Sequence, residues 1–139
     1  MNRVEKATTN HEKGYNCAQA VACAFSDVIE VDEKLIFQMT EGMGLGMGCM
    51  QGTCGAINGA VTILGLHSST GNLESPDSKA DTYRLSKKLV HTFEEKNQSI
   101  VCKELKGIET KKVLRSCPGC VADAECFLMP FTLSESSTV

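Results

Sequence analysis

The segment from Gly42 to Gly55 constrains the fold more than any other part of the chain. Its sequence, GMGLGMGCMQGTCG, contains six glycines in fourteen residues. Glycine has no side chain to pack and loses much conformational freedom on folding, so this density disfavours the interior of a helix or strand. We therefore predict a loop. The segment follows no predicted strand and contains no Gly-Lys-Ser/Thr sequence, so it indicates neither dinucleotide nor P-loop phosphate binding.

Apolar residues on both sides of this loop recur at helical spacing. The stripe from Ala18 to Ile29 predicts one helix that starts near residue 16, and Asp32 can cap a second helix that ends where the glycines begin. Beyond the loop, the pattern predicts helices over residues 56–69, 78–97, 99–107 and 117–128.

No segment alternates between apolar and polar residues with a period of two, so no strand is predicted. We expect an all-α fold, a compact bundle of about five helices with the glycine-rich loop between the second and the third. A chain of 139 residues fits a single domain over residues 1–139, with a polar tail, 132–139, that frays.

Charge and hydropathy exclude two classes of partner. The chain has 14 Lys and Arg against 17 Asp and Glu, a net charge of −3, so there is no basic surface for nucleic acid. No apolar run reaches the ~20 residues that a membrane helix needs, and residues 1–14 have no apolar signal stretch. We expect a cytoplasmic protein that binds neither nucleic acid nor membrane.

Eight cysteines are the chemically notable residues. They make up about 6% of the chain, below the level of a disulfide scaffold, and reduced cysteines in the cytosol are more often ligands or redox groups than crosslinks. Free cysteine is also a common buried residue, so any one of them can simply fill the core. The three histidines, in contrast, are scattered, and we interpret His11, His67 and His91 as solvated or capping residues.

Helix geometry separates these cysteines. Cys17 and Cys23 are six residues apart, about 240° around a continuous helix, so they face different sides, and Cys17 borders the apolar stripe. The same separation divides Cys120 from Cys126. We therefore expect Cys23 and Cys126 to lie outside any shared site.

Three other cysteines, Cys54, Cys102 and Cys117, lie at predicted helix starts. Unpaired N–H groups and partial positive charge at a helix N-terminus lower the pKa of a thiol and favour the reactive thiolate. The Cys117–Cys120 sequence, CPGC, has the CxxC spacing of a redox pair but lacks the βαβ context of thioredoxins. It indicates redox or metal chemistry without indicating that fold.

The segments around four of the cysteines resemble a known family. The segments are GYNCAQAV, GMGCMQGTCGAINGA, SIVCKELKG and SCPGCV, and together they resemble the family regarded as redox-active and named for its C_GCAxxG_C_C pattern. The resemblance covers residues 14–128. It implies that the four family cysteines are Cys17, Cys54, Cys102 and Cys117, with Cys49 or Cys120 as possible substitutes for one of them.

The resemblance also implies a redox role in an anaerobic bacterium, without an established enzymatic activity. A related helical domain accompanies an iron–sulfur centre in split-Soret cytochromes. We expect the four cysteines to form one site that binds an iron–sulfur cluster for electron transfer, with zinc as the alternative metal. Glycines near the site are expected to let backbone pack closely around the cofactor, namely Gly48, Gly52, Gly55 and Gly59.

Two alternatives remain open at this point. The same cysteines can cycle between dithiol and disulfide without a metal, as a redox protein or sensor. A helical adaptor with merely buried cysteines is the third possibility. For either redox function we expect a redox protein as partner, and a homodimer is compatible with the sequence.

Overall fold

The computed structural model describes the backbone of residues 1–137 and the side chains of residues 1–132. The described chain is all-α, as predicted, and its one β feature is an isolated bridge between Thr53 and Val101. It contains eight regular α-helices rather than about five. One additional helix is a ten-residue helix near the N-terminus that was not predicted. Another is short and arises because one predicted helix is divided in two. Within this described part, no helix has the length and apolar character that would let it cross a membrane.

The N-terminal region begins with a helix that the sequence pattern did not predict, α1 (Arg3–Glu12). Its N-cap is Asn2, whose side-chain oxygen accepts a hydrogen bond from the Glu5 backbone N–H at 2.8 Å. The helix is mostly polar and buries few residues, among them Ala7 and Asn10. Its apolar periodicity is therefore weak, which explains why it was missed.

The predicted helix over the stripe from Ala18 to Ile29 is divided in two. α2 (Cys17–Cys23) starts at a capping box, in which Asn16 and Gln19 each satisfy the other's backbone N–H. The chain turns at Phe25, and α3 (Ser26–Ile29) follows. The prediction of one continuous helix was wrong because the stripe stays apolar on both sides of this turn. α4 (Glu33–Thr40) follows Asp32 as predicted, although the Asp32 side chain makes no cap hydrogen bond.

The glycine-rich segment is irregular. It begins with a 3-10 turn, η1 (Glu41–Met43), and continues into α5 (Gly44–Met47). The backbone of α5 is not right-handed, because φ is +52° at Leu45, +56° at Gly46, +64° at Met47 and +82° at Gly48. Four consecutive left-handed residues form a turn that costs energy at Leu45 and Met47, which have side chains.

The C-terminal half contains the long helices. They are α6 (Gly55–Ser68), α7 (Lys79–Asn97), α8 (Cys102–Lys106) and α9 (Cys117–Ser137). α6 and α7 agree with the predicted ranges to within one residue, whereas α8 is shorter than the predicted 99–107 because residues 99–101 are not helical and Val101 forms the bridge with Thr53. α9 continues through Pro130 to Ser137, well beyond the predicted end at residue 128, so it includes much of the tail that we expect to fray. Residues 138 and 139 lie outside the described residues.

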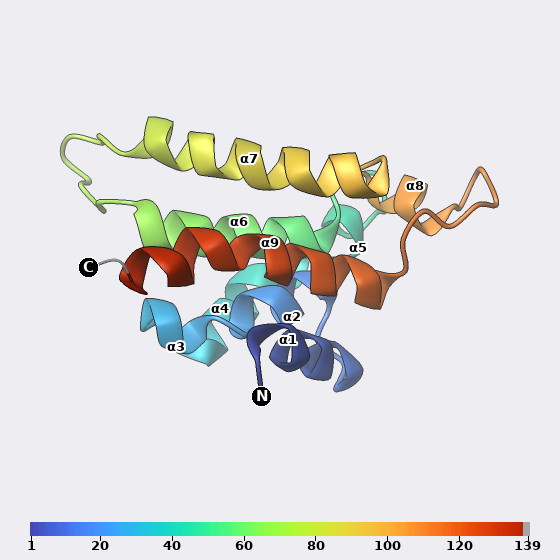
Figure 1. The fold of residues 1–139 in the computed structure, drawn as a ribbon, viewed down its shortest axis with the longest axis horizontal. Coiled ribbons are helices and arrows are strands. Elements are labelled where there is room, and N and C mark those ends of the chain that lie inside the picture. The colour runs from blue at the N-terminus through green and yellow to red at the C-terminus, as the bar shows by residue number, and fades with distance from the viewer. Residues whose placement is uncertain (138–139) are drawn as a thin grey trace.

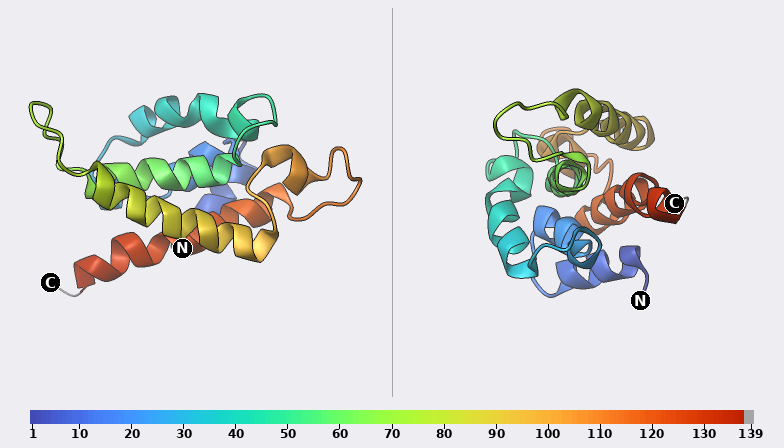
Figure 2. Two further views of the ribbon diagram at one scale, coloured as in Figure 1. Left: turned by 90° about the horizontal axis from the view of Figure 1, so that it is seen from above. Right: turned by 90° about the vertical axis from the view of Figure 1, so that its left-hand side faces the viewer.

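The arrangement of these helices gathers several helix starts at one end of the bundle. α7 lies along α6, α9 runs beside both, and α1 to α4 cover the other side (Figure 1; Figure 2). α6 and α9 both start at the end where α5 and α8 lie (Figure 1). The core between these layers is apolar, with fully buried side chains that include Phe25, Ile36, Ile63, Leu89 and Phe93.

Candidate thiol site

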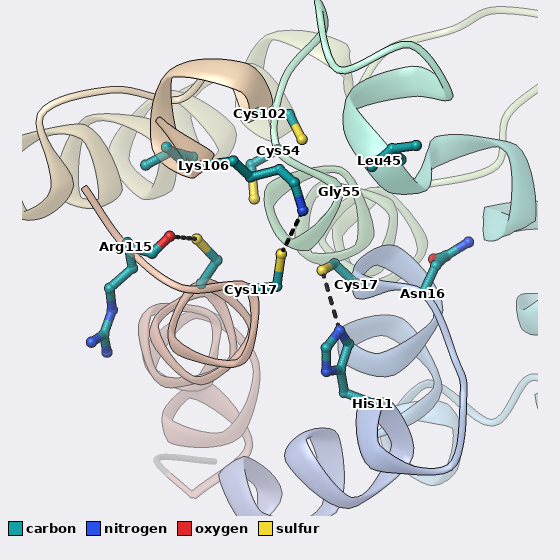
Figure 3. Close-up of a pocket in the computed structure, with 12 residues that line it drawn as sticks. His11, Asn16, Cys17, Leu45, Cys54, Gly55, Cys102, Lys106, Arg115 and Cys117 are labelled. Atoms are coloured by element: carbon teal, nitrogen blue, oxygen red, sulfur yellow. Dashed lines mark hydrogen bonds between the residues drawn. The ribbon is translucent and has the colours of Figure 1, made fainter. Parts of the chain in front are cut away.

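Five cysteines line one pocket of about 190 Å³ at this end of the bundle. They are the four family cysteines Cys17, Cys54, Cys102 and Cys117, together with Cys120. In Figure 3, the sulfur atoms of the four labelled cysteines approach one another from separate elements. The structure thus places all four expected site residues on one pocket and adds a fifth thiol.

Each of the four family cysteines stands at the start of a helix. Cys54 is the residue directly before α6, while α8 and α9 begin at Cys102 and Cys117. The sequence pattern placed these three at helix starts. Cys17 is a fourth case, because it is the first residue of α2, after the Asn16 cap.

Close packing of α2 against α6 brings Cys17 near Cys54. Gly59 lies so near the Ala18 carbonyl group that a Cβ atom would clash with its oxygen. One turn earlier, a Cβ atom on Gly55 would lie 3.3 Å from the Ala18 nitrogen. Gly59 therefore permits an approach that a side chain would prevent, and a side chain at Gly55 would require its neighbours to shift slightly.

The glycine-rich segment holds the start of α8 in place. The Gly52 carbonyl oxygen accepts a hydrogen bond from the Cys102 backbone N–H at 3.0 Å, and a side chain at Gly46 would clash with the Cys102 Cβ atom. Of the four glycines predicted near the cofactor, only Gly55 lines the pocket itself. Gly52 and Gly59 act by supporting the elements around it, and Gly48 lies in open space at the end of the left-handed turn.

One cation points at the thiols. The Lys106 ammonium donates a hydrogen bond to the Cys117 sulfur at 3.4 Å, and Figure 3 shows its side chain reaching into the pocket from α8. The charge of a Cys117 thiolate, and then this hydrogen bond, raise the pKa of Lys106, so the lysine stays protonated. Sequence reasoning missed Lys106, although it follows Cys102 by four residues and so shares its helix face.

His11 also reaches the pocket, from the last turn of α1. Its Nε2 atom lies 3.7 Å from the Cys17 sulfur (Figure 3). The interpretation of His11 as a solvated or capping residue was therefore wrong. No sequence pattern indicates this contact, because it depends on how α1, an unpredicted helix, packs beside α2.

The thiols differ in acidity. The Cys120 thiol donates to the Arg115 carbonyl oxygen at 4.0 Å, and its interaction with Cys54 is the main reason that the pKa of Cys54 falls to about 7 despite burial. The backbone N–H groups of Ala56 and Ile57 also lower it, although no regular side-chain cap closes the start of α6, and the charge of Lys106 adds to the effect. Cys54 is thus the thiol most readily ionised near neutral pH.

A helix start does not lower every thiol pKa, contrary to our expectation. Burial raises the pKa of Cys102, and the neighbouring Cys54 raises it further. Burial also raises the pKa of Cys17 to about 12, with further contributions from the charges of Cys117 and Cys54 and a hydrogen bond with Cys117. At these two cysteines the loss of solvation outweighs the helix terminus.

The four cysteines outside the family set differ in position: Cys120 lines the pocket and the other three do not. Cys120 is 3% exposed, and its pKa is raised by its hydrogen bond to Cys54 and by burial. Cys49 and Cys126 are exposed, Cys23 is buried beside the Glu33 carbonyl oxygen at 3.8 Å, and none of the three lines the pocket. Of the two possible substitutes, Cys120 is therefore at the pocket and Cys49 is not.

No group of three or more Cys, His, Asp or Glu side chains among the described residues is placed so that it could hold a metal ion. All eight cysteines are free. The five thiols thus line one pocket but are not positioned to coordinate a single metal ion.

A buried carboxylate fixes the start of α9. Asp123 accepts hydrogen bonds from Lys96 Nζ at 2.6 Å, Asn97 Nδ2 at 3.1 Å and Arg115 Nε at 3.0 Å. Arg115 is thereby turned away from the thiols (Figure 3). These bonds join α7 and the segment before Cys117 to the first turns of α9.

Comparison with known proteins identifies the family. A family model with the description "Putative redox-active protein (C_GCAxxG_C_C)" matches residues 15–129. No curated protein and no solved structure matches the chain. The matched region contains all five cysteines of the pocket and ends within α9. Because the match covers most of the sequence, the chain belongs to the C_GCAxxG_C_C family.

Proposed function

We propose that the protein is a single-electron carrier whose iron–sulfur cluster is bound by Cys17, Cys54, Cys102 and Cys117. The observation that carries the proposal is the convergence of these four thiols, from four separate helix starts, on one pocket of about 190 Å³. Four cysteine ligands are the usual set for a cluster with two or four irons. The cluster would supply the one-electron chemistry, and a second redox protein would exchange electrons with it.

The spread of the thiols favours a cluster over zinc. Four thiolates on a zinc ion all lie about 2.3 Å from one centre, so they must approach each other closely. Thiolates that bind different irons of a cluster surround a larger body. Because no three such ligands among the described residues are placed to hold one ion, the open arrangement suits the larger body better.

The electrostatics of the pocket also favour an anionic group. The N-termini of the two long helices α6 and α9 face it, and each contributes partial positive charge. Lys106 adds a full positive charge beside Cys117. These groups offset the negative charge that four thiolates would bring to a largely buried site.

Anaerobic reconstitution tests the proposal. Reduced protein is incubated with ferrous iron and sulfide, desalted, and analysed for iron, acid-labile sulfide, visible absorption and electron paramagnetic resonance. We expect stoichiometric uptake by the wild type and by Cys126→Ser, because Cys126 lies outside the pocket. Cys54→Ser should take up little. Absence of uptake by folded wild-type protein would contradict the cluster.

A metal-free dithiol mechanism is the second candidate, and the thiol contacts favour it. Within the pocket, Cys54 interacts with Cys120, and Cys17 interacts with Cys117. The two pairs could therefore exchange electrons two at a time as disulfides. A reversible two-electron thiol titration in protein that takes up no iron would support this candidate instead.

A further inference from the structure

We propose that Cys120 is a resolving cysteine for Cys54: when a small peroxide oxidises Cys54, Cys120 forms a disulfide with it. This disulfide would protect Cys54 from irreversible oxidation and withdraw it from the four-cysteine site. Cys120 is not one of the four cysteines assigned to the family pattern.

The contact between the two thiols supports this pairing. Cys54 and Cys120 line the same pocket, and an interaction between their thiols lowers the pKa of Cys54 and raises that of Cys120. Cys54 precedes the first turn of α6, Cys120 lies in the first turn of α9, and these two helices pack against each other. A resolving cysteine must stand beside the oxidised one, and Cys120 lines the same pocket as Cys54 from a helix that packs against α6.

Burial determines the kind of oxidant. Cys54 is 5% exposed and Cys120 is 3% exposed, so a protein disulfide cannot dock on either sulfur. The pocket that they line has a volume of about 190 Å³ and also borders the half-buried Cys17 and Cys117. A molecule of the size of hydrogen peroxide can enter such a space, whereas a folded partner cannot.

The reaction balances with one peroxide. The Cys54 sulfur attacks a peroxide oxygen, the O–O bond breaks, and Cys54 becomes a sulfenic acid while the other oxygen leaves as water with the thiol proton. The Cys120 sulfur then attacks the Cys54 sulfur, an S–S bond forms, and the S–O bond breaks. The hydroxide that leaves takes the Cys120 proton, giving a second water. Two electrons pass from the two thiols to the peroxide.

The consequence for the site rests on the proposed function. Cys54 is one of the four proposed cluster ligands, so its disulfide with Cys120 would leave only three. Oxidised protein should then take up iron and sulfide only after the disulfide has been reduced. The pairing itself does not depend on a cluster.

Disulfide mapping tests the pairing directly. Reduced, metal-free protein is treated with limiting hydrogen peroxide, free thiols are alkylated, and the digest is analysed by mass spectrometry without reduction. The tryptic peptide with Cys54 also contains Cys49, and the peptide with Cys120 also contains Cys117 and Cys126, so fragmentation of the linked peptides must assign the bond. We expect Cys54 linked to Cys120 in the wild type and in Cys126→Ser.

Cys120→Ser should lose this link and accumulate sulfinic acid at Cys54, whereas Cys126→Ser, on the same helix, should not. A Cys54 bond to any other cysteine in the wild type would overturn the pairing without relying on a variant that must fold. Equal over-oxidation of Cys54 in the two variants would overturn it as well.

A second arm separates this inference from the proposed function. Oxidised wild type should fail to load iron and sulfide until dithiothreitol is added. If reduced protein also fails to load, the cluster proposal is wrong while the mapped disulfide stands. If oxidised protein loads as well as reduced protein, the withdrawal of Cys54 from the site is wrong.

Discussion

Gly59 of α6 lies directly against the backbone carbonyl group of Ala18 in α2, and no side chain separates them. Cys17 precedes Ala18, and Cys54 is five residues before Gly59, so this contact fixes the distance between two of the site cysteines. The GAING segment, residues 55–59, therefore has a packing role. It brings two helix starts together rather than binding a ligand directly.

A methyl group at Gly59 should consequently disturb both the fold and the site. Gly59→Ala would force α2 away from α6, and overpacking of this kind costs about 1–3 kcal/mol of unfolding free energy. We expect lower stability in urea unfolding and reduced iron and sulfide uptake. Gly65→Ala is the matched control, because it lies in the same helix with no atom within 4 Å of the added carbon.

The control variant, Gly65→Ala, should be more stable than the wild type. Alanine has the higher helix propensity, so Gly65→Ala should stabilise the protein by roughly 0.5–1 kcal/mol. If Gly59→Ala were as stable as Gly65→Ala, the close approach of α2 and α6 would not be a constraint, and the packing role of the motif would be wrong.

Lys106 should adjust the redox potential of the proposed cluster. Its ammonium is 3.4 Å from the Cys117 sulfur, and a nearby positive charge favours the more negative, reduced state. A partly screened charge is worth about 1 kcal/mol, which for one electron corresponds to roughly 40 mV. Lys106→Met should therefore lower the reduction potential by tens of millivolts, as measured by spectroscopic redox titration.

Lys103→Met is the control for this prediction. Lys103 lies in the same helix but pairs with Glu109 at 3.1 Å, outside the pocket. It should leave the potential nearly unchanged. Equal shifts in the two variants would mean that the potential responds to net charge alone and not to the contact between Lys106 and Cys117.

Glu125 should make stability fall as pH rises. It is fully buried in α9, neither carboxyl oxygen has a hydrogen-bond partner, and burial raises its pKa from 4.5 to about 9 against the opposing charges of Arg3 and Lys6. Between these two pH values the folded protein holds one proton more than the unfolded chain. This group's contribution is thus greatest below pH 4.5 and is lost as pH rises toward 9, at up to about 1.4 kcal/mol per unit.

Urea unfolding between pH 5 and pH 9 measures this effect. Glu125→Gln removes the titration, so its stability relative to the wild type should increase steadily over this range. The exposed Glu12 on α1 gives the control substitution, Glu12→Gln, which should keep the wild-type slope. A wild type and a Glu125→Gln variant with parallel pH profiles would contradict a protonated, buried Glu125.

The structural features that depend on local sequence pattern were predicted correctly. Apolar periodicity predicted the fold class and the approximate ranges of α6 to α8. Gly107, which is left-handed in the structure, marks the end of α8, and Pro118 marks the start of α9 at Cys117. Four of the five cysteines that line the pocket were identified through the family resemblance.

What the sequence did not predict depends on contacts between elements. α1 is held by packing on α2 and α9 rather than by its own pattern, so it was missed, and the contact of His11 with Cys17 was missed with it. Cys120 was predicted as a possible substitute ligand, whereas Lys106 was also missed; both positions have a usable signal. Each follows a site cysteine by three or four residues, Cys117 and Cys102 respectively, and so shares its helix face.

Asp123 should control the stability of the end of the bundle that carries the site. Its carboxylate is 5% exposed and accepts hydrogen bonds from Lys96, Asn97 and Arg115. Burial alone would raise its pKa, but these bonds outweigh burial and hold the pKa below the usual 3.8. Asp123→Asn should cost about 2 kcal/mol of unfolding free energy at pH 7, because charge-assisted hydrogen bonds are lost.

The pH dependence of this loss follows from the lowered pKa. The stability contributed by Asp123 is present above pH 3.8 and disappears as pH falls through the lower folded pKa, so the difference between wild type and Asp123→Asn in urea unfolding should shrink as pH falls below 3.8. Asp81→Asn is the control, because Asp81 is exposed and pairs only with Arg84 at 3.2 Å among the ion pairs of the described residues. That surface pair is worth less than about 1 kcal/mol. A difference between wild type and Asp123→Asn that stays constant through acid unfolding would mean that the ionised carboxylate is not what joins α7 to the start of α9.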